Sequence, residues 1–243
     1  GCNFTDIMDG LSRLGLTEGH RIIPAVDPVM LARRAARERA EAKRKSRQAY
    51  TLWKAAEPIR GTLAEAYLRA RNITGSLPDT LRFHPSVWHP SAQRLPAMIA
   101  LVEGSNEFSV HRTYLTAGKA VKASVLPSKA MLGSVKGGAV RLSRSAGDLV
   151  VAEGIETALS LSSGLITSSC TLWAALSTSG LKCLHLPSTP NRLTIAMDGD
   201  RAGREAGNVL AQRAVALGWI VSLLPAPEGR DWNDVLCERG VKL

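Results

Sequence analysis

The C-terminal part of this 243-residue chain alternates short apolar runs with helical segments. Residues 149–152 form a continuous apolar run, typical of a strand buried on both faces, and a helical stretch through Leu161 follows it. Further strands and helices are predicted at 171–176, 193–197, 202–217, 219–224 and 231–238. Strands that alternate with helices form a parallel sheet, whose ligand site lies at the carboxyl ends of the strands.

Acidic residues stand at those carboxyl ends. Glu153 directly follows the first predicted strand, and Asp198 and Asp200 follow the third. Carboxylates gathered at one sheet edge repel one another unless a proton or a cation neutralises them. Mg²⁺ prefers hard oxygen ligands and needs only one or two protein carboxylates. The sequence therefore predicts a magnesium site here, while Asp200 as a helix cap and Asp198 as a turn residue before Gly199 stay open as alternatives.

The charge of the chain is divided unevenly. The whole sequence has 31 Lys and Arg against 21 Asp and Glu, a net charge of +10. Residues 1–147 carry a net +12 and residues 148–243 a net −2. This division predicts that the first part binds a polyanion and that the second binds cations or contains the catalytic residues. Candidate contacts to nucleic acid or nucleotide are Arg112, Lys119, Lys122, Lys129, Lys136 and Arg201.

The first part is predicted to contain both helices and strands. Helical patterns cover 4–16, 30–54 and 62–71, and short strand-like segments follow at 81–84, 97–102, 109–115 and 139–142. The basic helix at 30–54 suits either solvation or phosphate contact. Trp53 and Trp88 could stack on bases, although core packing is the simpler explanation. The predicted organisation is N-terminal helices with a basic helical linker (1–60), a basic α+β subdomain (61–147) and an α/β domain (148–243).

Three sequence strings carry a family resemblance. They are Val-Val-Ala-Glu-Gly at 150–154, Ala-Met-Asp-Gly-Asp-Arg-Ala-Gly at 196–203 and Pro-Glu-Gly-Arg-Asp-Trp-Asn-Asp at 227–234. Over residues 148–238 the chain resembles the Toprim domain of DnaG-type primases and of phage or plasmid primase-helicases. The resemblance implies a Rossmann-like α/β sheet of about four mainly parallel strands flanked by helices, after a smaller basic α+β domain.

The same resemblance implies two-metal nucleotidyl transfer. Asp198 and Asp200 would bind Mg²⁺, for which Mn²⁺ may substitute, and Glu153 would bind metal or accept the proton of the attacking 3′-hydroxyl. Asp231 corresponds to a further metal-site acid. Bacterial primases usually have Asp-Pro-Asp where this chain has Asp-Trp-Asn at 231–233, and their second acid after the glutamate is Thr157 here, with Glu156 beside it. The ligands of a second metal are therefore left open.

The resulting functional hypothesis is a DNA primase core that makes short RNA primers. Its partners would be single-stranded DNA template, ribonucleoside triphosphates and a replicative helicase. Toprim domains also occur in nucleases, where the same acids direct water at a phosphodiester. A nucleic-acid-binding module with a vestigial metal site is the third hypothesis. The length argues against a topoisomerase, which carries large gate and strand-passage domains.

Cellular context comes from the apolar runs and the cysteines. No run approaches the ~20 residues that span a bilayer, and no secretory signal is visible, so we expect a cytoplasmic protein without a membrane partner. Four scattered cysteines do not form a disulfide scaffold. Cys2 resembles the last ligand of the zinc ribbon that precedes many primase cores, or is a lone terminal cysteine. One cysteine cannot assemble a Zn²⁺ site alone.

Overall fold

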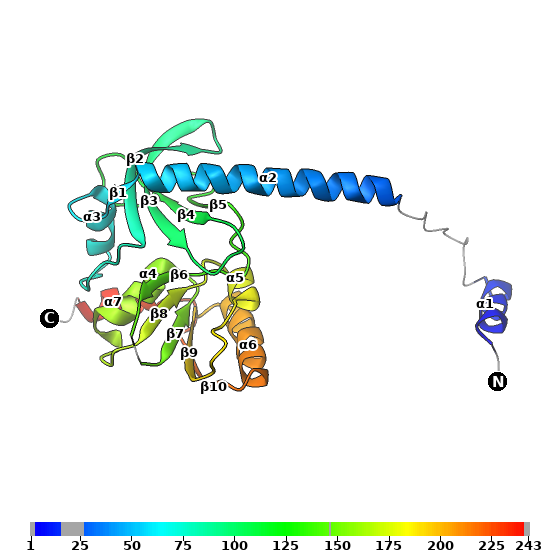
Figure 1. The fold of residues 1–243 in the computed structure, drawn as a ribbon. Helices are drawn as coiled ribbons and strands as arrows, with labels where there is room; N and C mark the ends of the chain where they lie inside the picture. Colours follow the sequence, from blue (N-terminus) through cyan, green and yellow to red (C-terminus); the bar gives the residue numbers. More distant parts are fainter. Residues whose placement is uncertain (1–2, 16–26, 146, 241–243) are drawn as a thin grey trace. The chain divides into compact units, whose positions relative to one another are not determined.

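A computed structural model describes residues 3–15, 27–145 and 147–240 (Figure 1). The chain divides into two units, residues 1–40 and 41–243. The first unit holds helix α1 (Phe4–Arg13), which begins with a capping box, and the start of helix α2 (Pro28–Ala55). Within the described residues, no helix combines the length and apolar character needed to cross a bilayer.

The first sheet of the second unit is antiparallel. Its strands lie in sequence order, β1 (Glu57–Pro58), β2 (Leu81–His89), β3 (Gln93–Val102), β4 (Ser109–Tyr114) and β5 (Lys129–Leu132). Because successive side chains of a strand point to opposite faces, each strand supplies two cores. Val110 and Tyr114 pack with Trp53 of α2 on one face. Met98 and Ala100 pack on the other face with helices α3 (Leu63–Arg69) and α4 (Ile155–Ser160).

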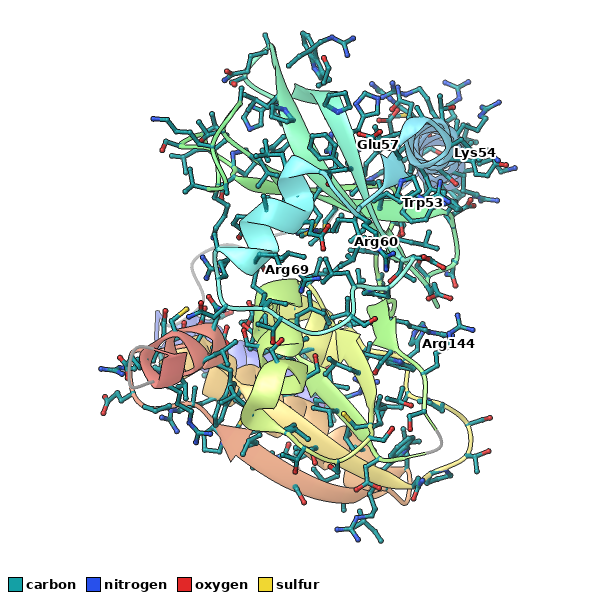
Figure 2. All side chains as sticks on the ribbon, turned by 90° about the vertical axis from the view of Figure 1, so that its left-hand side faces the viewer. Trp53, Lys54, Glu57, Arg60, Arg69 and Arg144 are labelled. Atoms are coloured by element: carbon teal, nitrogen blue, oxygen red, sulfur yellow. The ribbon has the colours of Figure 1, made fainter. Side chains whose placement is uncertain are left out.

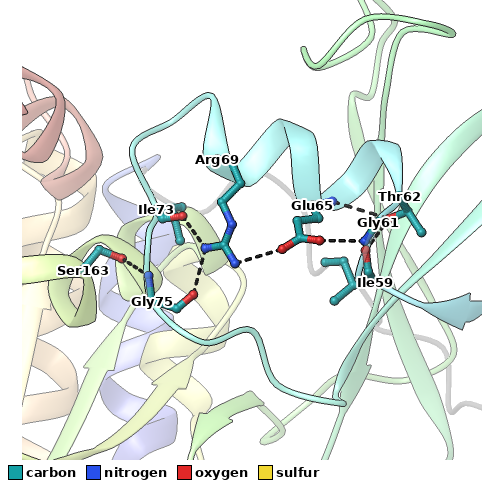
Figure 3. Close-up of polar contacts among 8 residues, drawn as sticks. All are labelled: Ile59, Gly61, Thr62, Glu65, Arg69, Ile73, Gly75 and Ser163. Atoms are coloured by element: carbon teal, nitrogen blue, oxygen red, sulfur yellow. Dashed lines mark hydrogen bonds and ion pairs between the residues drawn. The ribbon is translucent and has the colours of Figure 1, made fainter.

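Helix α3 and the segment after it tie the two sheets together (Figure 3). Thr62 caps the helix by accepting a hydrogen bond from the backbone N–H of Glu65. Arg69 pairs with Glu65 at 2.9 Å and donates to the carbonyl of Gly75 at 2.8 Å. The N–H of Gly75 in turn donates to Ser163 Oγ, which follows α4, at 3.4 Å. The segment after α3 is thereby fixed against the second sheet's helices.

The second sheet confirms the predicted α/β architecture. Its order is β10-β9-β7-β8-β6, with only β6 antiparallel to its neighbour. The strands are β6 (Val140–Ser143), β7 (Leu149–Ala152), β8 (Thr171–Ala174), β9 (Arg192–Met197) and β10 (Ile220–Pro225). Helix α4 and helix α7 (Trp232–Gly240) cover one face (Figure 1). Helices α5 (Thr178–Cys183) and α6 (Arg201–Ala216) cover the other, and a π-helical turn (Leu161–Leu165) continues α4.

Residues 139–142, expected in the sheet of the basic subdomain, belong instead to the second sheet. Val140 pairs with Ala174 of β8, and only Ala139 forms a bridge with Glu103 beside the first sheet. The alternating burial of this segment suits the edge of either sheet, so its pattern cannot identify the partner. Strands β1 and β5 and helix α5 were not predicted, and each has six residues or fewer.

Candidate functional site

The predicted acids lie where the strand order of the second sheet reverses. From β7 the chain continues to β8 on one side, whereas β9 continues to β10 on the other. Ala152 of β7 pairs with Ala196 of β9, so Glu153 and Asp198 follow adjacent strands. Ligands of open α/β sheets bind in the crevice at such a switch point. The carboxylates are therefore at the sheet's expected ligand edge.

The loop after β9 is fastened to the loop before α7. The N–H of Gly199 donates to the carbonyl of Arg230 at 2.7 Å, and the N–H of Gly229 donates to the carbonyl of Gly199 at 3.2 Å. Asp231 follows directly and accepts hydrogen bonds at Oδ1 from the N–H groups of Asn233 and Asp234, at the start of α7. These backbone bonds bring Asp231 to the edge that carries the other acids.

Asp198 is a partly buried acid whose pKa is strongly raised by its surroundings. Its Oδ1 is buried and has no hydrogen-bond partner within the described part of the chain. Burial raises the pKa of Asp198 to about 7, and the negative charges of Glu153, Asp231 and Asp200 act in the same direction, against Lys129. Burial and like charges disfavour the ionised form of a carboxylate, so a bound cation or a proton stabilises it.

Glu153 and Asp200 have different surroundings. Burial and the charge of Asp200 raise the pKa of Glu153, against a backbone hydrogen bond from Thr178 and the charge of Lys129. Asp200 Oδ1 accepts a hydrogen bond from the N–H of Gly203 at 2.6 Å and caps α6. The capping role that the sequence left open for Asp200 is therefore present. It fixes this carboxylate at the carboxyl edge of the sheet.

The donor set of this edge suits a hard divalent cation. In the described residues, no three His, Cys, Asp or Glu side chains are already positioned to hold a metal ion. The acids nevertheless supply carboxylate oxygens, including the buried Oδ1 of Asp198. A cation here would relieve the repulsion that raises the pKa of Asp198. Mg²⁺ needs few protein ligands because it keeps several waters. The residues present fit that ion.

Glu156 and Asn233, at or beside the positions where the chain departs from bacterial primases, help to join the two sheets. Glu156 is buried and accepts hydrogen bonds from Tyr67 Oη and Lys129 Nζ, each at 2.8 Å. Burial alone would raise its pKa, but Lys129 and the hydrogen bonds outweigh burial and hold the pKa well below its usual value. Asn233 Nδ2 donates to the carbonyl of Arg71 at 2.8 Å and to Ser160 Oγ at 2.9 Å.

The predicted basic contacts fall into three groups. The positive charge of Lys129 acts on the pKa of both Glu153 and Asp198, and Asp231 acts on the pKa of Lys122, so these lysines lie close enough to the acids to influence their charge. Arg112 lies on the opposite, α2-facing side of the first sheet, where it approaches the ring of Tyr114. The remaining candidates are exposed: Lys119, Lys136 and Arg201. Cys2 lies outside the described residues.

Arg71 is a site residue that the sequence did not reveal. It follows α3 and lies over the ring of Tyr67 at 5.8 Å. Its Nε is buried and finds no hydrogen-bond partner in the part of the chain that the structure describes. Together with desolvation and Lys129, its charge lowers the pKa of Lys122. A single arginine after a helix carries no sequence signal, because its neighbours come from distant segments.

Gly199 offers a direct test of how the site is assembled. A Cβ at this position would lie 1.8 Å from the carbonyl oxygen of Pro227, which is backbone and cannot rotate away. Gly199→Ala is therefore expected to destabilise the fold by about 1–3 kcal/mol, because the loop that carries Asp231 must move. Chemical denaturation measures the change. Gly10→Ala is the control, since nothing lies within 4 Å of its added methyl group; equal stability of both variants would contradict the close packing.

Two family models match the chain. The Toprim domain model matches residues 148–242. A model described as a domain of unknown function (DUF7146) matches residues 43–142. Residues 148–242 are thus a Toprim domain, and the resemblance seen in the sequence is confirmed for this segment. No curated protein sequence matches the chain.

Several solved primase structures are similar to this chain at low identity. A DNA primase domain from Pseudomonas aeruginosa has 17% identity and a TM-score of 0.45, covering 80% of this chain and 74% of that chain. The zinc-binding and RNA polymerase domains of the Aquifex aeolicus primase have 14% identity and a TM-score of 0.46, covering 98% of this chain and 64% of that chain. The RNA polymerase domain of Mycobacterium tuberculosis primase DnaG has 15% identity and a TM-score of 0.42, covering 83% and 80%. The chain thus spans less than two thirds of the Aquifex structure.

Proposed function

We propose that this chain, whose residues 148–242 form a Toprim domain, is a primase-like nucleotidyltransferase core that makes short RNA primers on single-stranded DNA. The observation that carries the proposal is the buried Asp198 Oδ1 at the switch point of the sheet, which has no hydrogen-bond partner among the residues that the structure describes. Glu153, Asp200 and Asp231 add negative charge around it. Such a cluster suits cation-assisted chemistry on phosphates. The Toprim match supports a function of the primase-like or wider Toprim type.

In this proposal Asp198, Asp200 and Asp231 hold Mg²⁺, or Mn²⁺ in its place. The bound ion supplies charge neutralisation on the triphosphate and lowers the pKa of the attacking hydroxyl. The chain's own residues keep the carboxylates at the crevice. Asp200 is fixed by capping α6, and Asp231 by the backbone N–H groups at the start of α7.

Glu153 is the proposed proton acceptor. Its raised pKa makes the carboxylate more basic than an exposed glutamate. The primer's 3′ oxygen would attack the α-phosphorus of the incoming nucleotide as its proton passes to Glu153. The new oxygen–phosphorus bond replaces the bond to the β-phosphate, and pyrophosphate leaves. The carboxylate then returns its proton to solvent.

Lys122 and Arg71 are the proposed contacts to the triphosphate. Lys122 is half-buried, and desolvation is the largest cause of its lowered pKa. Repulsion from Lys129 and Arg71 lowers the pKa further. Cations held close together beside acids attract phosphate oxygens, because the phosphates relieve their mutual repulsion. Lys129 is already paired with Glu156, so its predicted contact to nucleotide would be made from that ion pair.

A product assay tests this function. The purified chain is incubated with single-stranded DNA, labelled ribonucleotides and Mg²⁺ or Mn²⁺, and the products are separated by length. New labelled oligonucleotides are the expected result. Shortened DNA in their place would identify a Toprim nuclease. Neither product, with full retention of DNA binding, would favour a binding module and would overturn the proposal. Addition of a replicative helicase tests that partner in the same assay.

A further inference from the structure

A second candidate site lies on the face of the first sheet that α2 covers. A groove of about 650 Å³ is lined by residues of α2 and of the sheet, and we call it the α2 groove. Apolar side chains such as Leu52, Val87 and Leu132 form much of its lining. Four arginines also line it: Arg44, Arg47, Arg94 and Arg112. Among the described residues that line the groove, none is acidic.

The wall of the α2 groove is fixed by hydrogen bonds. The register of β2 against β3 shifts between His84 and Val87, a bulge that bends the hairpin. The carbonyl of Trp88 then accepts hydrogen bonds from Tyr114 Oη at 2.9 Å and from Arg112 Nη1 at 3.3 Å. His89, fully buried, bonds through Nε2 to the carbonyl of Pro127 at 2.9 Å. The hairpin therefore presents a preformed wall rather than a loose loop.

The groove and the acidic site are on opposite faces of the first sheet. Arg112 of β4 pairs with Ala130 of β5, and both face α2. Lys129, one residue earlier on β5, points to the other face and contacts Glu156. A ligand in the α2 groove would thus be separated from the acids by the thickness of the sheet.

The chemistry of the groove matches single-stranded nucleic acid. Trp88 is 54% exposed although it is a large aromatic residue, and Arg94 lies 5.9 Å from its ring centroid. An exposed aromatic face beside guanidinium groups binds an unpaired base and its phosphates. Glu41 already pairs with Arg44, so Arg47 and Arg94 are the stronger phosphate contacts. A duplex keeps its bases stacked inside and cannot offer one to the groove.

We propose that the α2 groove binds a segment of single-stranded nucleic acid, with a base against Trp88 and phosphates on Arg47 and Arg94. This site would hold a strand apart from the acidic crevice and does not depend on the proposed catalytic function. It would explain why an apolar groove is lined by arginines and why the hairpin beside it is so firmly anchored.

Fluorescence anisotropy with a labelled oligo-dT tests the proposal. The full chain is titrated in EDTA over a range of salt concentrations, so that metal-dependent binding at the acids is removed. Trp88→Ala is expected to weaken binding about tenfold with an unchanged salt slope, because stacking carries no charge. Trp88→Phe should restore most of the affinity. Arg47→Ala should reduce the salt slope by about 0.7, the value for one lost single-strand phosphate contact.

Lys54→Ala is the matched control for the charge variant. Lys54 is an exposed residue of α2 and does not line the groove. Figure 2 labels it and shows the helix along its axis. Lys54→Ala should leave the salt slope close to that of the unaltered protein. Equal effects of Lys54→Ala and Arg47→Ala would overturn the proposal, because they would indicate a general attraction to positive charge. Equally strong competition by duplex DNA would overturn it as well.

A second pair of variants separates this proposal from the proposed function. Lys122→Ala removes a cation at the acidic site and should leave binding in EDTA largely intact. If Lys122→Ala abolishes binding while Trp88→Ala does not change it, the strand binds only at the acids and the α2 groove proposal fails. If groove binding holds but no oligonucleotide is made, the catalytic function fails instead.

Discussion

Replacement of Asp198 by asparagine is expected to abolish nucleotide incorporation without destabilising the protein. The asparagine keeps the shape of the side chain but removes the charge from the centre of the acidic cluster. We expect incorporation to fall by more than about a hundredfold, since the cation and its charge stabilisation would be lost. The thermal midpoint should stay equal or rise, because Asp198 is repelled by Glu153, Asp231 and Asp200.

Asp148→Asn is the matched control for Asp198→Asn. Asp148 lies just before the amino end of β7, at the edge opposite the acids, and forms an exposed ion pair with Arg192 at 3.3 Å. The same chemical change there should leave incorporation unchanged and cost at most about 1 kcal/mol. A primer-synthesis assay and a thermal unfolding scan measure both variants. Full incorporation by Asp198→Asn would contradict the proposed role of Asp198, and a large fall of its thermal midpoint would show instead that Asp198 is a structural residue.

The expected gain in stability has a general physical basis. A protein that gathers carboxylates at one edge stores electrostatic repulsion in its folded state. The fold tolerates this because separate structural bonds hold the acids in place, such as the cap of α6 by Asp200 and the helix-start bonds of Asp231. Removing the repulsion stabilises the protein but removes its proposed function, which is the usual trade-off at an active site.

The acidic crevice was predictable because its signals are local. The buried strand 149–152 reads as a continuous apolar run, and an acid immediately after such a strand must lie at the sheet edge. Which strands are neighbours depends on the topology of the sheet, and a doubly wound sheet allows few strand orders. The sequence placed Asp198 at the same sheet edge as Glu153, and the pairing of β7 with β9 shows that their strands are neighbours.

The sequence could not show which basic residues lie on which face of the first sheet. Arg112 and Lys129 both appeared as contacts to nucleic acid, but the register of β4 against β5 places them on opposite faces. β5 has four residues that are all half-buried, so it has no alternating pattern to reveal which side chains face α2. The α2 groove depends on that division and on a bulge in β2, and neither can be derived from composition.

Lys129→Met is expected to be the most destabilising of the substitutions considered, because it leaves a buried charge without its partner. The ammonium of Lys129 lies 2.8 Å from Glu156 Oε2, and the Glu156 side chain is 5% exposed. Removing one partner of a buried ion pair costs several kcal/mol, and we expect about 3 kcal/mol here because Lys129 itself is a third exposed. Urea denaturation near pH 7 measures the loss. Lys119→Met, in an exposed loop, controls for the added apolar side chain.

The pH dependence of that loss has a defined sign. In the unaltered protein the folded-state pKa of Glu156 lies below its unfolded value, so its contribution is present above the unfolded pKa and is lost as pH falls through the folded pKa. Without Lys129, burial raises the folded pKa of Glu156 above the unfolded value, so the folded state gains a proton as pH falls. The difference in stability between the two proteins should therefore shrink from pH 7 towards pH 4.

A double variant shows whether the loss belongs to this pair alone. Glu156→Gln in the Lys129→Met background removes the unpaired charge and still accepts the hydrogen bond from Tyr67 Oη. We expect it to recover much of the lost stability and to remove the part of the pH dependence that Glu156 contributes, because this side chain then no longer titrates. A double variant no more stable than Lys129→Met would contradict this account. In that case the lysine would stabilise the junction of the two sheets through another partner.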